Sequence, residues 1–74
     1  MPEALDARGL FCPLPVLKTR RAIRRLAVGD LLTVLATDPA SRIDMRHFCN
    51  TSGNELVDAR EEAGVFTYVI RRTA

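Results

Sequence analysis

The 74-residue sequence contains no tryptophan, one histidine, two cysteines, one tyrosine and three phenylalanines. It has no apolar run close to the roughly 20 residues that a membrane-spanning helix needs. A zinc site usually takes four ligands, and only Cys12, Cys49 and His47 offer sulfur or imidazole donors, so we expect no metal and no other cofactor. Glycine-rich phosphate loops and Ser-His-Asp constellations are also absent.

Length and composition limit the class of protein. We expect residues 1–74 to form a single domain, because a chain of this size supports one small core. The hydrophobic content of 47% is too high for a disordered chain. The first residues show no basic region followed by an apolar stretch, which predicts no signal peptide and a cytoplasmic location away from membranes. Two cysteines in such a reducing compartment argue against a structural disulfide.

The net charge of +2 is small, but the basic residues are unevenly distributed. Five of the eleven fall in one short stretch, namely Lys18, Arg20, Arg21, Arg24 and Arg25. Any one of them is explained as a solvated surface residue, whereas their concentration indicates an acidic protein partner or an RNA backbone. The small net charge and the few aromatic residues argue against direct nucleic-acid binding.

A cysteine followed by two prolines separates a strand pattern from a helix pattern, and residues 8–15 read RGLFCPLP. Pro13 suits the first position of a helix, where its missing N–H is not needed, and Pro15 still lies in the first turn. Cys12 is therefore predicted to be the N-cap residue or its immediate neighbour. Helix N-termini favour negative charge, so this position predicts a lowered thiol pKa and a nucleophilic thiolate, with Arg8 and Lys18 adding to the effect. The alternative is a buried, inert cysteine.

Alternation and helical spacing predict four strands and two helices. The strands are expected at residues 4–10, 30–37, 55–62 and 65–72, with a hairpin turn at Ala63-Gly64. The helices are expected at residues 13–27 and 41–52, ended by Gly29 and Gly53. Gly9 is expected to permit a turn or a close approach that sets the angle at which Cys12 is presented.

Each predicted helix has an apolar face. The first consists of Val16, Thr19, Ala22, Ile23, Leu26 and Ala27, and the second of Ala40, Met45, Phe48 and Cys49. Ser41 fits an N-cap, with Asp44 in the position of a capping-box acid. Cys49 is predicted to pack in the core and to stay protonated, and His47 to lie on an exposed face.

The strand–helix–strand unit at the start of the chain predicts a right-handed crossover with parallel strands. Cys12 follows the first strand and Asp38 follows the second, so both lie at the same edge of the sheet, where sites in α/β sheets gather. Asp38 can cap the chain before Pro39, recognise a partner, or face the thiol, in which case it would raise the thiol pKa. We favour the capping role.

The last strand alternates between two sets of side chains. Phe66, Tyr68 and Ile70 are expected to pack beneath the helices. Val65, Thr67 and Val69, with Leu31 and Leu35, are expected on a sheet face that no helix covers. That face is either an ordinary half-exposed surface or an apolar patch used for association.

The stretch LDARGL at residues 5–10, followed by Cys-Pro-x-Pro, resembles the signature of the TusA/SirA family of small sulfur carriers. Further similar positions are Val28-Gly29-Asp30, Val34, Thr37-Asp38-Pro39, Asp44-Met45, Phe48, Gly53 and Glu55-Leu56. The resemblance covers nearly the whole chain. One departure is Gly53-Asn54, where many members have a Gly-His pair, and it leaves the subgroup open.

The resemblance implies an α/β (α+β) two-layer sandwich of order βαβαββ, with two helices on one face of a four-stranded mixed sheet. It implies that Cys12 is the catalytic residue and carries a persulfide, supported by Gly9, Pro13, Pro15 and Asp38. Sulfur would arrive from a cysteine desulfurase or a rhodanese-type protein and pass to an acceptor protein. The acceptor would serve tRNA thiolation, cofactor-related trafficking or oxidative sulfur metabolism.

Residues expected to bind these partners are Arg8, Lys18, Arg20, Arg21 and Arg24. Arg20 and Arg24 are the best candidates because they lie one turn apart on the same side of the helix. Two other functions stay open at this stage. One is a binding module that applies the basic helix to RNA or to an acidic regulator, and the other is a redox protein that forms a Cys12–Cys49 disulfide.

Overall fold

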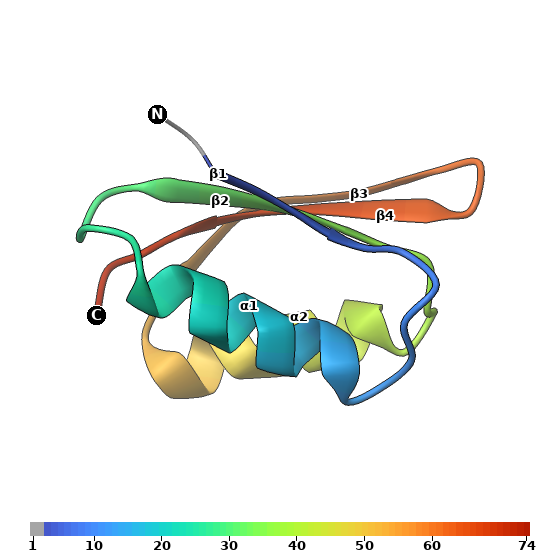
Figure 1. The fold of residues 1–74 in the computed structure, drawn as a ribbon, viewed down its shortest axis with the longest axis horizontal. Helices are drawn as coiled ribbons and strands as arrows, with labels where there is room; N and C mark the ends of the chain where they lie inside the picture. The colour runs from blue at the N-terminus through green and yellow to red at the C-terminus, as the bar shows by residue number, and fades with distance from the viewer. Residues whose placement is uncertain (1–2) are drawn as a thin grey trace.

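The computed structural model describes residues 3–74, which form four strands and two helices in two layers (Figure 1). The elements are β1 (Glu3–Ala7), α1 (Leu14–Arg24), β2 (Leu31–Ala36), α2 (Ser41–Ser52), β3 (Glu55–Glu62) and β4 (Val65–Arg71). The sheet order is β1-β2-β4-β3, with β1 parallel to β2 and the other neighbours antiparallel. Both helices cover the same sheet face, which confirms the predicted fold class and the mixed sheet. No helix within residues 3–74 is long and apolar enough to cross a membrane.

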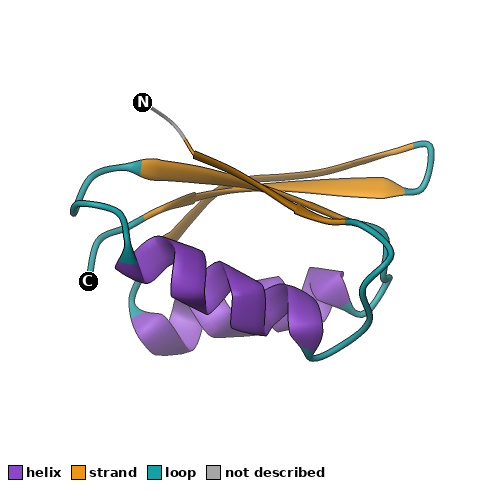
Figure 2. Cartoon of the chain, viewed as in Figure 1, coloured by secondary structure: helices purple, strands orange, loops and turns teal. Residues whose placement is uncertain are grey.

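The parallel pair β1 and β2 determines where the loops leave the sheet. Ala7 and Ala36 are register partners at the ends of the two strands. The loops that follow them therefore run side by side at one end of the sheet (Figure 2). Gly9, at a φ of 80°, donates its N–H to Thr37 Oγ1 at 2.9 Å and so joins the two loops. A side chain at this φ is strained, which explains why glycine occupies the turn.

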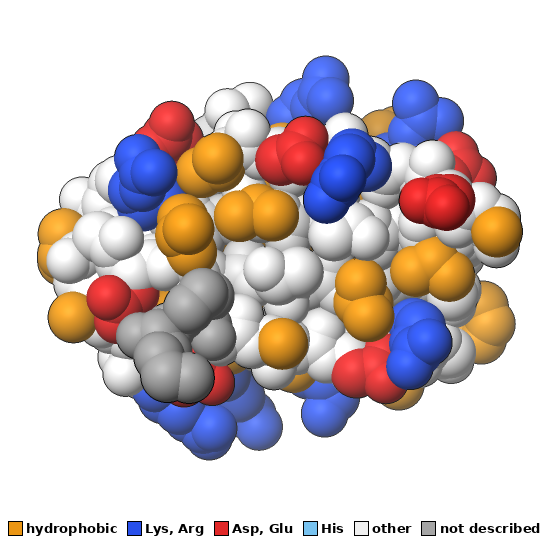
Figure 3. All heavy atoms as spheres, turned by 90° about the horizontal axis from the view of Figure 1, so that it is seen from above, with side chains coloured by type: hydrophobic (Ala, Val, Ile, Leu, Met, Phe, Trp, Pro, Cys, Tyr) orange, Lys and Arg blue, Asp and Glu red, His pale blue; other side chains and the backbone are white. Residues whose placement is uncertain are grey.

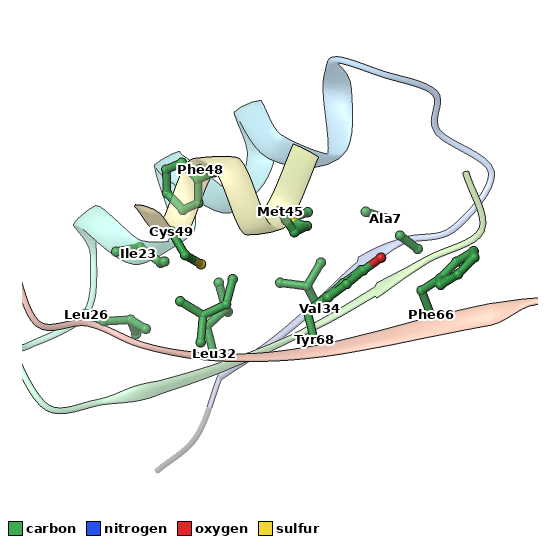
Figure 4. Close-up of a cluster of buried hydrophobic side chains, with 12 residues drawn as sticks. Ala7, Ile23, Leu26, Leu32, Val34, Met45, Phe48, Cys49, Phe66 and Tyr68 are labelled. Carbon is green, nitrogen blue, oxygen red and sulfur yellow. The ribbon is translucent and has the colours of Figure 1, made fainter. Parts of the chain in front are cut away.

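The core lies between the sheet and the helices (Figure 4). It contains Ala7, Ile23, Leu26, Leu32, Val34, Ala36, Met45, Phe48, Cys49, Phe66, Tyr68 and Ile70. The predicted inward set of β4 is therefore confirmed. Tyr68 and Ser41 share a buried hydroxyl–hydroxyl hydrogen bond of 2.6 Å, which satisfies both groups inside the core.

Three predictions about the start of the second helix are wrong. Ser41 is not the N-cap, because its hydroxyl is used by Tyr68 and Ala40 occupies the N-cap position without a side-chain cap. Asp44 is consequently not half of a capping box. Ala40 is exposed rather than part of the core.

The first strand and the first helix are both shorter than predicted. β1 ends at Ala7, where the turn at Gly9 begins, and α1 ends at Arg24 instead of residue 27. One distant and one local contact explain the early end. Arg72, from the far end of the chain, donates to the carbonyls of Arg24 and Leu26, and the nearby Asp30 accepts from Ala27 N–H at 3.1 Å. These bonds satisfy backbone groups that would otherwise need another helical turn. Ala27 is therefore exposed, and Gly29 forms the following turn instead of ending the helix.

The closing hairpin follows the sequence pattern closely. Ala63 and Gly64 both have positive φ, at 51° and 79°, as a two-residue type I′ turn requires. As expected, Val65, Thr67, Val69, Leu31 and Leu35 lie on the sheet face without helices, and all five are half-buried. Figure 3 shows that apolar side chains on this face lie in separate groups among charged side chains and backbone.

Candidate functional site

The loop that leaves β1 carries an exposed thiol to the start of α1. Cys12 directly precedes Pro13, the N-cap residue of the helix, and Pro15 is the second helical residue. The predicted position of Cys12 beside the N-cap is confirmed. Pro13, however, is the N-cap residue itself and not the first helical residue, as was expected. The Cys12–Pro13 peptide bond is cis. The interpretation of Cys12 as a buried, packed cysteine is wrong.

Asp38 holds the backbone at Cys12. Its Oδ2 accepts the Cys12 N–H at 2.7 Å, and its Oδ1 accepts the Ala40 N–H at 3.1 Å. One carboxylate therefore closes the turn before α2 and fixes the loop that presents the thiol. The predicted proximity of Asp38 to Cys12 is confirmed, and so is its part in closing the turn.

Replacing Asp38 by alanine is expected to loosen this loop and to cost about 1–2 kcal/mol of unfolding free energy, because two charge-assisted hydrogen bonds are lost. Urea unfolding measures the cost, and the amide NMR resonance of Cys12 reports the loop. Asp30→Ala is the matched control, because Asp30 also accepts a backbone N–H but precedes β2, at the opposite end of the parallel strand pair from Cys12. A Cys12 resonance that shifts equally in both variants would contradict the role given to Asp38.

Carboxylates, not cations, control the protonation of Cys12. A hydrogen bond to the Asp44 carboxylate raises the pKa of the thiol above its ordinary value, and desolvation and the charges of Asp44 and Asp38 act in the same direction. The prediction of a lowered pKa is therefore wrong. Cys12 precedes the helix instead of lying in its first turn, where the dipole is strongest. Arg8 is occupied elsewhere, since its guanidinium pairs with both oxygens of Asp6 at 2.9 Å.

Cys12 opens onto a groove between the two helices. The groove has a cavity volume of about 240 Å³. The residues that line it are Cys12, Pro13, Val16, Arg20, Asp44, His47, Phe48 and Thr51. The Arg20 guanidinium lies 6.0 Å from the centre of the Phe48 ring. Of the residues predicted to bind partners, Arg20 shares this groove with the thiol, and Arg24 lines a groove adjoining it. Arg8, Lys18 and Arg21 line neither groove.

Asp44 and His47 were not identified as site residues from the sequence. Asp44 was assigned to a helix cap and His47 to a solvated surface. Their spacing with Phe48 and Thr51, at steps of three and four, places all four on one stripe of α2, which is the signal that would have grouped them. Within residues 3–74, no cluster of three or more Cys, His, Asp or Glu side chains is arranged to hold a metal ion.

The second thiol is inaccessible. Cys49 is 4% exposed, packs in the core as predicted, and has its pKa raised to about 11 by burial. We expect iodoacetamide to modify Cys12 completely before any Cys49 reacts in the folded protein, and both thiols to react in denaturant. Peptide mass mapping after timed labelling measures this order. Comparable rates for the two cysteines under native conditions would contradict the assigned burial.

Asn54 has a structural role. Its Oδ1 accepts the N–H groups of Thr73 and Ala74, at 3.0 and 3.3 Å, and its Nδ2 donates to Ser52 Oγ at 3.1 Å. Asn54 thus holds the end of the chain against the loop after α2. This accounts for asparagine at the position where the resemblance leads one to expect histidine.

Together, the fold and the thiol define the class: a small two-layer α+β protein that presents one accessible cysteine at the start of a helix. Residues 3–72 match the family described as Sulfurtransferase TusA. The chain is 51% identical over 74 residues to the sulfur carrier protein TusA of Pseudomonas putida (strain F1), covering 99% of this chain and 92% of that protein. The chain therefore belongs to the TusA family of sulfur carrier proteins.

Other relatives agree with this assignment. Sulfur carrier protein TusA of Pseudomonas aeruginosa (strain LESB58) is 51% identical over 70 residues, covering 95% of this chain and 89% of that protein. The crystal structure of a SirA-like protein from Desulfitobacterium hafniense matches over 100% of both chains, with a TM-score of 0.84 and 26% identity.

Proposed function

We propose that this protein accepts a sulfur atom as a persulfide on Cys12 and passes it to an acceptor protein. The observation that supports this most is the contrast between its two thiols. Cys12 is exposed, held by Asp38 and open to a groove, whereas Cys49 is buried. The relatives are named sulfur carriers, and Cys12 is the accessible cysteine within residues 3–74.

The proposed loading step is an exchange at sulfur. Cys12 Sγ, as the thiolate, attacks the outer sulfur of a donor's cysteine persulfide. A new S–S bond forms at Cys12 as the donor's S–S bond breaks, and the electron pair leaves on the donor's cysteine sulfur. The proton lost by Cys12 is balanced by the one that the donor thiolate gains. No net oxidation or reduction occurs, so no further reactant is required.

Asp44 gives this exchange a direction. The carboxylate raises the pKa of the resting thiol, which lowers its thiolate fraction and slows its reaction with a donor. A persulfide is a stronger acid than the thiol it replaces, and its anion beside Asp44 experiences like-charge repulsion. That repulsion favours handing the sulfur on. The other cysteine is buried, so discharge requires a partner instead of an internal disulfide.

The proposed donors are a cysteine desulfurase or a rhodanese-type protein, and the proposed acceptors serve tRNA thiolation, cofactor synthesis or oxidative sulfur metabolism in the cytoplasm. The test is intact-mass measurement of the reduced protein after incubation with a persulfide-loaded desulfurase or rhodanese. We expect a gain of one sulfur atom that a thiol reductant reverses. No gain from either donor, when each still releases sulfide to dithiothreitol, would reject the proposal.

A further inference from the structure

The groove at Cys12 does not end at Arg20. A second groove, with a cavity volume of about 380 Å³, shares Arg20, Phe48 and Thr51 with the first and continues past Ile23 to Arg24. Together they form one seam groove between α1 and α2, which lie side by side beneath the sheet (Figure 1), and Asn54, Arg72 and Ala74 also line its far end. The seam groove thus connects the thiol with the C-terminal end of α1.

The cations along this groove are not neutralised by the protein itself. Within residues 3–74 the ion pairs are Arg8–Asp6, Arg60–Asp58 and Arg71–Glu55, none of which involves a residue of either helix. α1 carries four cations and no acid, and α2 carries two arginines and one acid, Asp44. The helix layer is therefore positive, although the whole chain has a net charge of only +2.

The shape and lining of the groove suit an extended peptide. Val16 supplies half-buried apolar surface, and Arg20 lies over the buried Phe48 ring. The 11 residues of α1 span about 16 Å at about 1.5 Å per residue. An extended segment of about five residues covers that length at about 3.3 Å per residue.

We propose that the seam groove binds an extended acidic segment of a protein partner, whose reactive sulfur lies at Cys12 and whose acidic side chains pair with Arg20 and Arg24. This inference rests on the proposed function, because the segment is the part of the partner that exchanges sulfur. Asp44 determines the direction, since it repels acidic residues from the end of the groove at Cys12.

Helix geometry also predicts the spacing within the segment. Arg20 and Arg24 lie about 9 and about 15 Å beyond the first residue of α1. The acidic residues should therefore lie about three and about five positions from the partner's reactive cysteine, on one side of it in the extended chain. Guanidinium–carboxylate pairs at both positions supply specificity through paired hydrogen bonds.

RNA fits the groove less well. Stacking on aromatic rings is the usual source of affinity for unpaired bases. Phe48 is 4% exposed and its ring faces Arg20, so the groove offers no free aromatic surface. Apolar contacts beside two arginines match a peptide with alternating apolar and acidic side chains.

The test uses two fluorescein-labelled heptapeptides with serine in place of the reactive cysteine, one with glutamate three and five positions after the serine and one with glutamate three and five positions before it. The binding of each is measured by fluorescence anisotropy. The double variant Arg20→Gln/Arg24→Gln is compared with Arg21→Gln/Arg25→Gln. The second pair removes the same charge from the same stretch but lines neither part of the seam groove. We expect at least a tenfold loss of affinity for the first pair, less than a threefold loss for the second, and weaker binding of a peptide with the glutamates next to the serine.

Equal losses for the two pairs, no peptide binding by the unmodified protein, or tighter binding of an RNA homopolymer than of the peptide would each overturn the inference. Sulfur loading from a small persulfide, glutathione persulfide, separates this inference from the proposed function. Loading of the unmodified protein on Cys12 tests the carrier role by itself, because a small donor does not need the groove. If Cys12 is loaded normally but the two double variants bind the peptide equally well, only the proposal about the seam groove is rejected. If Cys12 is not loaded, the proposed carrier function is rejected.

Discussion

Replacing Cys12 by serine is expected to abolish sulfur acceptance, while Cys49→Ala and Cys49→Ser retain it. Serine removes the sulfur that attacks the donor's persulfide, and its hydroxyl is not ionised at neutral pH. Cys49 lies in the core, where its thiol contacts neither solvent nor donor. Intact-mass spectrometry of the three variants after incubation with a loaded donor should show one added sulfur in both Cys49 variants and none in Cys12→Ser.

The two Cys49 variants control for stability. Alanine removes the sulfur and leaves a small cavity, whereas serine places a hydroxyl in an apolar core at a cost of about 1–3 kcal/mol. Circular dichroism should show that Cys12→Ser is folded, because position 12 is exposed. Sulfur acceptance by folded Cys12→Ser, or its loss in folded Cys49→Ala, would contradict the assignment of Cys12.

The second large effect is expected at Asp44. Asp44→Asn removes the carboxylate that raises the pKa of Cys12, so the pKa should fall. Alkylation proceeds through the thiolate, so at pH 7 the variant should react several-fold faster than the unchanged protein. Well above both pKa values the thiolate is fully formed in each protein, and the rates should converge or cross slightly, since a less basic thiolate is a weaker nucleophile. Iodoacetamide rates from pH 6 to pH 11 measure the profile.

Asp58→Asn is the matched control, because Asp58 lies on β3 and pairs with Arg60. Its rate profile should coincide with that of the unchanged protein. A profile for Asp44→Asn that also coincides, or one displaced to higher pH, would show that Asp44 does not hold the thiol protonated. The same variant should discharge its persulfide more slowly to an acceptor if like-charge repulsion favours onward transfer.

The arrangement of Cys12 and Asp38 could be predicted from the sequence because it depends on topology. Two parallel strands joined by a helix end at the same edge of the sheet, and both residues follow those ends. The hairpin at Ala63-Gly64 could also be predicted from the sequence, since it is a local turn between two strands with alternating apolar and polar residues. These features depend on contacts close in sequence or on rules of chain connection.

The protonation of Cys12 could not be predicted in the same way. The helix start is a local feature and favoured a thiolate, whereas the opposing carboxylate of Asp44 is brought in by α2 from 32 positions away. The end of α1 shows the same limitation, because Arg72 from the far end of the chain donates to the carbonyls of Arg24 and Leu26. In both cases a tertiary contact outweighs a local preference.

The central claim is that Cys12 carries the sulfur, and peptide mass mapping of the loaded protein tests it most directly. The protein is incubated with a persulfide-loaded desulfurase, alkylated under native conditions, digested and fragmented. The account predicts one extra sulfur on the peptide that contains Cys12, removed by reductant, with Cys49 unmodified. An extra sulfur on Cys49, or none on either cysteine while the donor still yields sulfide to dithiothreitol, would contradict it.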